Sequence, residues 1–291
     1  MRRLHVLLAA VVASAVGVTP ASWASDNGEP RRQVTHEDFR REDFSSRSTT
    51  IDNRWLPLVP GTQYVWEGTA NRGEGTGAHR VVLTVTDVGK WVNGVHTLVL
   101  WDRDIQDGEL VEEELAFHAQ DDDGNVWGLG EYPEEHEDGK FVGAPSTWLA
   151  GEQRAQAGVM MRADPKEGTS SYFQGIAPEV DFKDEAKVAK EHQKTCVPTG
   201  CYHDVLVVDE WNPLNQPQDG HQFKFHAPGV GVVRVEARGG EEQETLVLVQ
   251  RRRLHDKEMD DARDRVLTLD RRAYHVAPDV YGDSPPAERL G

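Results

Sequence analysis

The chain has 291 residues, which is enough for one large domain or two small ones. Its formal net charge is −18, with 50 acidic residues against 32 basic ones. A charge of this sign repels nucleic acid and anionic lipid surfaces, so we expect no nucleic-acid partner, whereas divalent cations and cationic partners stay compatible with it.

The first 24 residues have the organisation of a secretion signal. Arg2 and Arg3 form a positive start, an apolar stretch runs from Leu4 to Val18, and small residues around Ala24 suit a signal peptidase. The stretch is shorter than the about 20 residues that span a bilayer, so we expect no transmembrane segment in the mature chain. The sequence predicts a secreted, extracytoplasmic bacterial protein, cleaved near Ala24, with an even more acidic mature part.

Two segments follow the signal. Residues 25–50 are polar with few apolar anchors, which predicts a flexible leader. Residues 51–253 contain short runs of β-branched and aromatic residues, separated at roughly ten-residue intervals by Asn, Asp and Gly, which predicts an antiparallel β domain. We expect strands at residues 63–68, 79–87, 95–103, 110–120, 126–130, 171–174, 185–195, 204–211, 222–226, 231–237 and 244–250.

The pattern within these strands predicts a mainly β fold built on a curved antiparallel sheet, a half-barrel. Residues 98–101 and 205–208 are apolar on both faces, so these strands should be central and covered on both sides. Residues 132–160 form the longest stretch without a strand pattern and are a candidate lid or flank.

One C-terminal helix is expected within residues 254–291. Apolar side chains recur at spacings of three and four from about Asp256 to Tyr274, and Pro278 should end the helix. The helix should dock on the sheet or on a partner, and the last residues look frayed.

Cys196 and Cys201 are the only cysteines, and they bracket a Pro-Thr-Gly turn. In an oxidising compartment this spacing favours a disulfide across the end of a hairpin. A zinc site is the alternative, but no second pair of ligands at regular spacing is visible.

The sequence contains none of the common catalytic motifs: no nucleophile elbow, no phosphate loop, no His-Glu-x-x-His and no dinucleotide fingerprint. We therefore assign no catalytic residue and expect no cofactor. Asp121, Asp123 and Asn125 resemble a calcium loop, but the register lacks the first ligand and the bidentate acid of an EF-hand. A hairpin turn is the favoured interpretation, with weak Ca²⁺ binding as the alternative.

A second acidic group lies on two consecutive strands. Asp102 and Asp104 share one face of a strand, as do Glu112 and Glu114 on the next. Carboxylates paired across a sheet could perform acid–base chemistry or hold a metal, or they could be the solvated face of an acidic protein.

Aromatic residues are numerous in and beside the expected strands. If the sheet is curved and incompletely covered, they would line a mainly apolar pocket on its concave face. The candidate pocket residues are Tyr64, Trp66, Trp101, Trp127, Trp211, Phe223 and Phe225.

Two stretches resemble a group of secreted bacterial β-domains that has no assigned active site. The segment from Val197 to Trp211 is similar to their V-P-A-G-T-F-x-D-V-L-V segment, and Phe225 to Val233 is similar to the Y-A-P-G-V-G-x-V entry that follows it. The resemblance covers about residues 51–250 and implies an architecture like the TapB-like and lipoprotein-carrier (LolA/LolB-like) half-barrels. It carries over no functional residue.

Three functional hypotheses follow. The first is an exported, non-enzymatic β-domain that binds an apolar or amphipathic ligand, such as a lipid, or an envelope partner. The second is a secreted metal-dependent hydrolase that uses Asp102, Asp104, Glu112 or Asp121. The third is a structural cell-surface protein.

Overall fold

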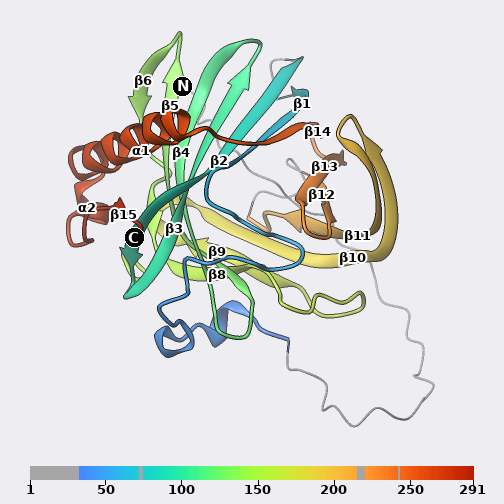
Figure 1. Cartoon of the computed structure of the whole chain (residues 1–291), viewed down its shortest axis with the longest axis horizontal. Helices are drawn as coiled ribbons and strands as arrows, with labels where there is room; N and C mark the ends of the chain where they lie inside the picture. The colour runs from blue at the N-terminus through green and yellow to red at the C-terminus, as the bar shows by residue number, and fades with distance from the viewer. Residues whose placement is uncertain (1–32, 72–74, 215–219, 242) are drawn as a thin grey trace.

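The computed structural model describes residues 33–71, 75–214, 220–241 and 243–291, so the expected signal peptide at residues 1–24 lies outside the described part. Within that part, twelve antiparallel strands form one closed barrel (Figure 1). Around the barrel they are β1 (Thr62–Asn71), β14 (Gln243–Arg253), β13 (Gly231–Arg238), β12 (His221–Ala227), β11 (Gly200–Trp211), β10 (Phe182–Val197), β9 (Tyr172–Ala177), β8 (Gln156–Met161), β5 (Val126–Glu137), β4 (Glu109–Gln120), β3 (Val95–Gln106) and β2 (Thr76–Val92).

The closure of the sheet corrects the expected half-barrel. Strand β1 pairs with β14 from Thr62 to Asn71, and it pairs with β2 from Gln63 to Asn71 on its other side. The first and last strands of the sheet therefore satisfy each other's backbone groups, and the sheet is not left with two open edges. Mainly β structure with a C-terminal helix is confirmed.

The predicted strands all fall on observed strands, and the structure adds others in the candidate lid. Residues 132–160 hold the end of β5, the short strands β6 (Lys140–Gly143) and β7 (Trp148–Leu149), which both pair with β5, and the start of β8. This stretch is thus part of the barrel wall and its flank.

The interior of the barrel is divided along its axis. Near the turns at Asn93-Gly94 and Gly229, the inward side chains are apolar and buried: Tyr64, Trp66, Val85, Leu98, Leu100, Ala116, Val188, Leu206, Val233 and Leu248. Residues 51–58 pack against this end. Near the turns at Asp107-Gly108 and Asp138-Gly139, the inward side chains are mostly polar.

Residues 33–50 differ from the expected flexible leader, because they pack on the barrel. They contain two 3₁₀ turns, η1 (His36–Asp38) and η2 (Arg41–Asp43). The rings of Phe39 and Phe44 lie 5.5 and 6.2 Å from the ring of Trp127 on β5. These aromatic contacts help to anchor a segment whose composition is otherwise polar.

The C-terminal segment lies against the outside of the barrel wall (Figure 1). Helix α1 (Asp256–Val276) buries Ala262, Val266, Leu269 and Ala273, the stripe that its apolar spacing predicted. The expected frayed tail is ordered instead: α2 (Pro278–Tyr281) follows, with Tyr281 fully buried, and β15 (Glu288–Arg289) pairs with β2.

Candidate functional site in the barrel interior

The four carboxylates singled out from the sequence meet inside the barrel. The register of β3 and β4 places Asp102 opposite Glu114 and Asp104 opposite Glu112. On the next strand, β5, Glu131 lies diagonally from Glu114 and adds a fifth carboxylate. Facing residues on adjacent strands have Cβ atoms about 4.5–5.5 Å apart, so this part of the wall presents a continuous acidic surface to the interior.

A histidine of β2 connects this acidic surface to a carboxylate of β14, on the far side of β1. The imidazole of His79, on β2, lies 2.5 Å from Asp104 Oδ1 through Nε2 and 2.9 Å from Glu244 Oε1 on β14 through Nδ1. Burial lowers the pKa of His79, but the hydrogen bonds to these two carboxylates raise it by more, to about 9. His79 is therefore a cation at neutral pH and neutralises part of the acidic surface.

A lysine occupies the opposite wall of the barrel. Lys224 Nζ, on β12, lies 2.5 Å from Glu210 Oε2 on β11, and Gln174 Nε2 donates to the other oxygen of Glu210 at 3.1 Å. Burial lowers the pKa of Lys224, but the charge and hydrogen bond of Glu210 raise it above its ordinary value. The charge of Lys224 also acts on Glu131 across the interior.

Asp102, Glu114 and Glu131 lack a cationic partner of this kind. Asp102 accepts a hydrogen bond from the backbone N–H of Arg103 at 2.7 Å, and Glu131 accepts one from Trp148 Nε1 at 3.1 Å. Within the described part of the chain, no hydrogen bond or ion pair engages the carboxylate of Glu114.

Because these three carboxylates lack a cationic partner of that kind, their pKa values are raised. Burial and the nearby charge of Asp104 raise the pKa of Asp102 to about 7. Burial, followed by the charges of Glu131 and Glu112, raises the pKa of Glu114 well above its usual value, and burial also raises that of Glu131. Near neutral pH Asp102 is therefore partly protonated, and an arriving cation could replace that proton.

Other polar atoms in the interior also lack partners among the described residues. They are the hydroxyl of Tyr172 on β9, Nδ1 of His118 on β4 and Nε2 of His226 on β12, and each of these side chains is at least nine-tenths buried. Burial lowers the pKa of both histidines to about 4, so their imidazoles are neutral at pH 7. An unsatisfied buried polar atom costs about 1–3 kcal/mol, so these atoms favour a guest that can hydrogen-bond to them.

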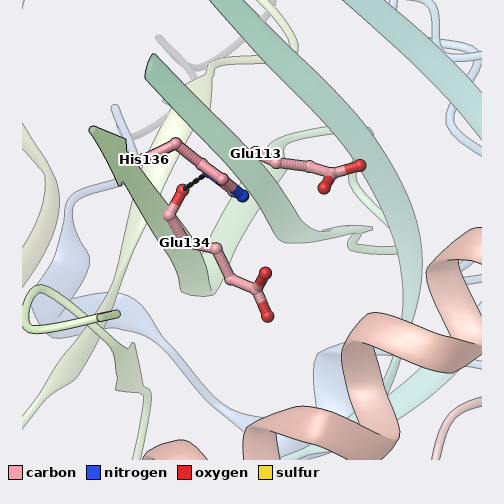
Figure 2. A group of neighbouring side chains, drawn as sticks. All are labelled: Glu113, Glu134 and His136. Atoms are coloured by element: carbon pink, nitrogen blue, oxygen red, sulfur yellow. Dashed lines mark hydrogen bonds between the residues drawn. The ribbon is translucent and has the colours of Figure 1, made fainter. Parts of the chain in front are cut away.

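A second acidic group lies on the outer face of the same strands. The ligand atoms of Glu113, Glu134 and His136 lie within 4.8 Å of one another, the spacing of a metal site (Figure 2). However, Arg265 of α1 donates two hydrogen bonds to Glu113, and Arg272 donates two to Glu134. Burial raises the pKa of Glu113, but the hydrogen bonds and charge of Arg265, together with the bond from Trp101, bring it below its ordinary value. The outer group thus anchors the helix.

The seven candidate aromatic residues do not line one pocket. Tyr64 and Trp66 face the interior, where their stacked rings lie 5.5 Å apart in the core. The other five lie on the outer face of the wall: Trp101, Trp127, Trp211, Phe223 and Phe225. Two surface hollows of about 420 and 400 Å³ include none of the seven in their linings.

The candidate calcium loop is a tightly bonded turn. Asp121 accepts hydrogen bonds from the backbone N–H of Asn125, from Asn125 Nδ2 and from Trp127 Nε1, all between 2.8 and 2.9 Å. Asp123 is exposed and lies apart from this network. The carboxylate of Asp121 is therefore engaged within the turn, and weak Ca²⁺ binding at Asp121, Asp123 and Asn125 stays a prediction. Asp121 also lies away from the interior carboxylates.

The predicted disulfide is present. Cys196 and Cys201 are bonded, with their Cα atoms 4.0 Å apart, at the end of the hairpin between β10 and β11. It closes a turn distant in sequence from the acidic strands β3 and β4.

The comparisons with known proteins give distant structural likenesses. No protein-family model matches the sequence, and no curated protein matches it either. A presumed lipoprotein of Parabacteroides distasonis is 13% identical with a TM-score of 0.40, over 69% of this chain and 99% of its own. A presumed exported protein of Bacteroides fragilis with a YmcC-like fold is 12% identical with a TM-score of 0.37, over 69% and 100%. None of the helices in the described ranges combines the length and the apolar character that a membrane-spanning helix requires.

Proposed function

We propose that this protein is an exported, non-enzymatic binding protein and that the interior of its barrel takes up a cationic ligand. The observation that carries the proposal is the pair Asp102 and Glu114, which face each other inside the barrel without a cationic partner. Enclosed carboxylates in proteins are normally paired with cations or metals, because an unpaired buried charge is costly. A bound cation would remove that cost.

The polarity of the interior favours this ligand over the lipid expected from the sequence. The inward aromatic residues, Tyr64 and Trp66, are in contact with each other in the core, whereas the carboxylates keep part of their surface exposed within the barrel. The strongly negative charge of the chain would also attract cations and speed their association.

A thermal-shift experiment tests the proposal. The probes are CaCl₂, MnCl₂, ZnCl₂ and spermidine, each added to the wild type and to the Glu114→Gln variant. A ligand that binds only the native state raises the melting temperature. We expect at least one probe to stabilise the wild type and to lose most of its effect in Glu114→Gln.

Glu109→Gln is the matched control, because Glu109 is the first residue of the same strand and is exposed at the turn with β3. It should respond to the probe as the wild type does. If no probe stabilises the wild type, or if all three proteins respond equally, the barrel interior is not a cation site.

A further inference from the structure

A surface hollow of about 400 Å³ lies at the end of β3 opposite to the interior carboxylates. Four segments far apart in the chain line it: Arg41 of η2, residues 91–94 at the turn between β2 and β3, residues 149–152 at the end of β7, and residues 283–285 after α2. This volume falls within the range of about 300–1,000 Å³ that is typical of small-molecule sites. The hollow is therefore large enough for a small ligand.

Hydrogen bonds hold the walls of the hollow in place. Arg41 donates to Asn93 Oδ1, which connects η2 to the turn between β2 and β3. Lys90 Nζ donates to the backbone oxygen of Pro285 at 2.8 Å, which fixes the segment after α2. A Cβ atom at Gly151 would lie 2.7 Å from Asn93 Oδ1, so only glycine allows the two segments to approach this closely. The walls are thus formed before any ligand arrives, which lowers the entropic cost of binding.

Trp91 gives the hollow an apolar surface. The residue is 42% exposed, and its ring stacks on the imidazole of His96 with the ring centroids 4.7 Å apart and the planes at 3°. Among the described residues, Trp91 lines the hollow and His96 does not. The hollow therefore meets the part of the indole that His96 leaves uncovered. Because the stacking fixes the plane of the ring, this part of the indole is a flat apolar platform.

Charged side chains with free hydrogen-bonding capacity lie beside this platform. The carboxylates of Glu152 and Asp283 take part in no hydrogen bond or ion pair within the described part of the chain. Arg41 donates a side-chain hydrogen bond to Asn93, which leaves most of its five N–H donors for other partners. The hollow thus offers acceptors and donors around one apolar surface, and its opposite charges largely offset each other.

This combination fits a pyranose sugar. A face of the pyranose ring carries C–H groups, which pack on the electron-rich face of an indole, and the hydroxyl groups at its rim both donate and accept hydrogen bonds. Carboxylates accept from such hydroxyls, and a guanidinium group donates to them. A cationic ligand would meet Arg41, and an anionic ligand would meet Glu152 and Asp283, so a neutral ligand suits the hollow best.

We infer that the hollow beside Trp91 is a saccharide-binding site, in which one pyranose ring stacks on Trp91 and its hydroxyl groups bond to Glu152, Asp283 and Arg41. The inference goes beyond the proposed function. It is also independent of it, because the hollow shares no residue with the carboxylate group inside the barrel.

Saturation-transfer difference NMR tests the inference on the purified protein. The probes are the methyl glycosides of D-glucose, D-galactose, D-mannose and N-acetyl-D-glucosamine, with sorbitol as a polyol without a ring and tetramethylammonium as a cation. We expect at least one glycoside to bind and the other two probes not to bind. Trp91→Ala should weaken that binding about tenfold, and Trp91→Phe, which keeps an aromatic face, should weaken it less.

Asp283→Ala tests the polar part of the site and should also weaken glycoside binding. Phe141→Ala is the control, because Phe141 is an aromatic residue of β6 that is 36% exposed outside the hollow, and it should leave binding unchanged. Melting curves establish that each variant is folded. Trp91 and Asp283 are both exposed, and each variant can replace the other in the test.

Three results would overturn the inference. The first is that no glycoside binds the wild type. The second is that glycoside binding survives in both Trp91→Ala and Asp283→Ala, because the sugar would then lie elsewhere. The third is that tetramethylammonium binds in place of the glycosides and is lost in Trp91→Ala. None of these results changes the thermal-shift test of the barrel interior, which depends on Glu114.

Discussion

Glu113 and Glu114 are neighbours on β4, yet the barrel wall separates their environments. Glu113 points outward to α1, where Arg265 and Trp101 donate hydrogen bonds to it and its pKa is lowered. Glu114 points inward, where it meets other carboxylates and its pKa is raised. Alternation along a strand, by which successive side chains point to opposite faces, is sufficient to produce this contrast.

The same contrast applies to the two acidic regions as wholes. On the outside, Arg265 and Arg272 of helix α1 pair with Glu113 and Glu134. Arg263 of the same helix pairs with Asp87 on β2. On the inside, His79 and Lys224 pair with Asp104, Glu244 and Glu210, and the carboxylates of β3 to β5 stay in excess. The outer carboxylates therefore stabilise the fold through these ion pairs. The inner carboxylates that lack a cationic partner lower the stability of the folded protein, and we attribute their presence to ligand binding.

The largest expected effect concerns the outer region. Lys90 of β2 is fully buried beneath α1, where its Nζ lies 2.9 Å from Asp270 and donates to the backbone oxygen of Pro285. Replacing it in Lys90→Met leaves Asp270 buried without its partner, which costs about 3–5 kcal/mol. Urea denaturation at pH 7 should show this loss in the free energy of unfolding.

Lys257→Met is the control for Lys90→Met. Lys257 pairs with Asp261 on the exposed side of α1, with both side chains mostly in solvent. Such pairs contribute about 0.3–0.5 kcal/mol, so this variant should remain close to the wild type. Equal losses in the two variants would contradict the view that buried ion pairs anchor the helix.

For the barrel interior we predict a substitution that raises the free energy of unfolding, whereas Lys90→Met lowers it. The pKa of Asp102 rises from 3.8 to about 7 on folding, so the folded protein binds a proton there more tightly than the unfolded chain does. This contribution to stability is present below about pH 4 and is lost as the pH rises through about 7. Since each pKa unit corresponds to about 1.4 kcal/mol, Asp102→Asn should stabilise the protein at pH 8 by at most about 4 kcal/mol.

The measurement is the free energy of unfolding of the wild type and of Asp102→Asn between pH 4 and pH 8, without added cations. The advantage of the variant should shrink steadily toward pH 4. A variant that is less stable than the wild type at pH 8 would show that the ionised Asp102 is already compensated within the barrel.

Several elements of this contrast could be predicted from sequence. The turn residues around β3 and β4 predicted these two strands. The alternation of side chains along a strand placed Asp102 with Asp104, and Glu112 with Glu114, on shared faces. Spacings of three and four predicted the buried stripe of α1. These features depend on residues close together in the chain, where backbone geometry limits the choices.

The remaining features depend on contacts between distant residues. The same alternation places Phe223 and Phe225 on one face of β12 and Gln222 and Lys224 on the other. It does not say which of the two faces points to the interior. The apolar group was expected inside, but the lysine lies there, paired with Glu210 of β11 and close enough to Glu131 of β5 for its charge to act on that carboxylate. Closure of the barrel likewise depends on β1 meeting β14, whose paired residues are between 172 (Asn71 and Gln243) and 191 (Thr62 and Arg253) positions apart. Arg265 lies four residues after Asp261 on α1, the spacing of a helical ion pair, yet it bonds to Glu113 on β4, and Asp261 pairs with Lys257.

The smallest expected effects test the contrast most directly, because they come from the same substitution at adjacent positions. Glu113→Gln removes the charge that Arg265 and Trp101 contact, and a charge-assisted hydrogen bond contributes about 1.5–3 kcal/mol, so this variant should lose stability at pH 7. Glu114→Gln removes a charge that faces other carboxylates, so it should gain about 1 kcal/mol, as relief of like-charge contacts commonly does. Urea denaturation of both variants at pH 7 provides the comparison. Two losses of similar size would mean that Glu114 has a cationic partner in solution, and the barrel interior would then have no unpaired charge to offer a ligand.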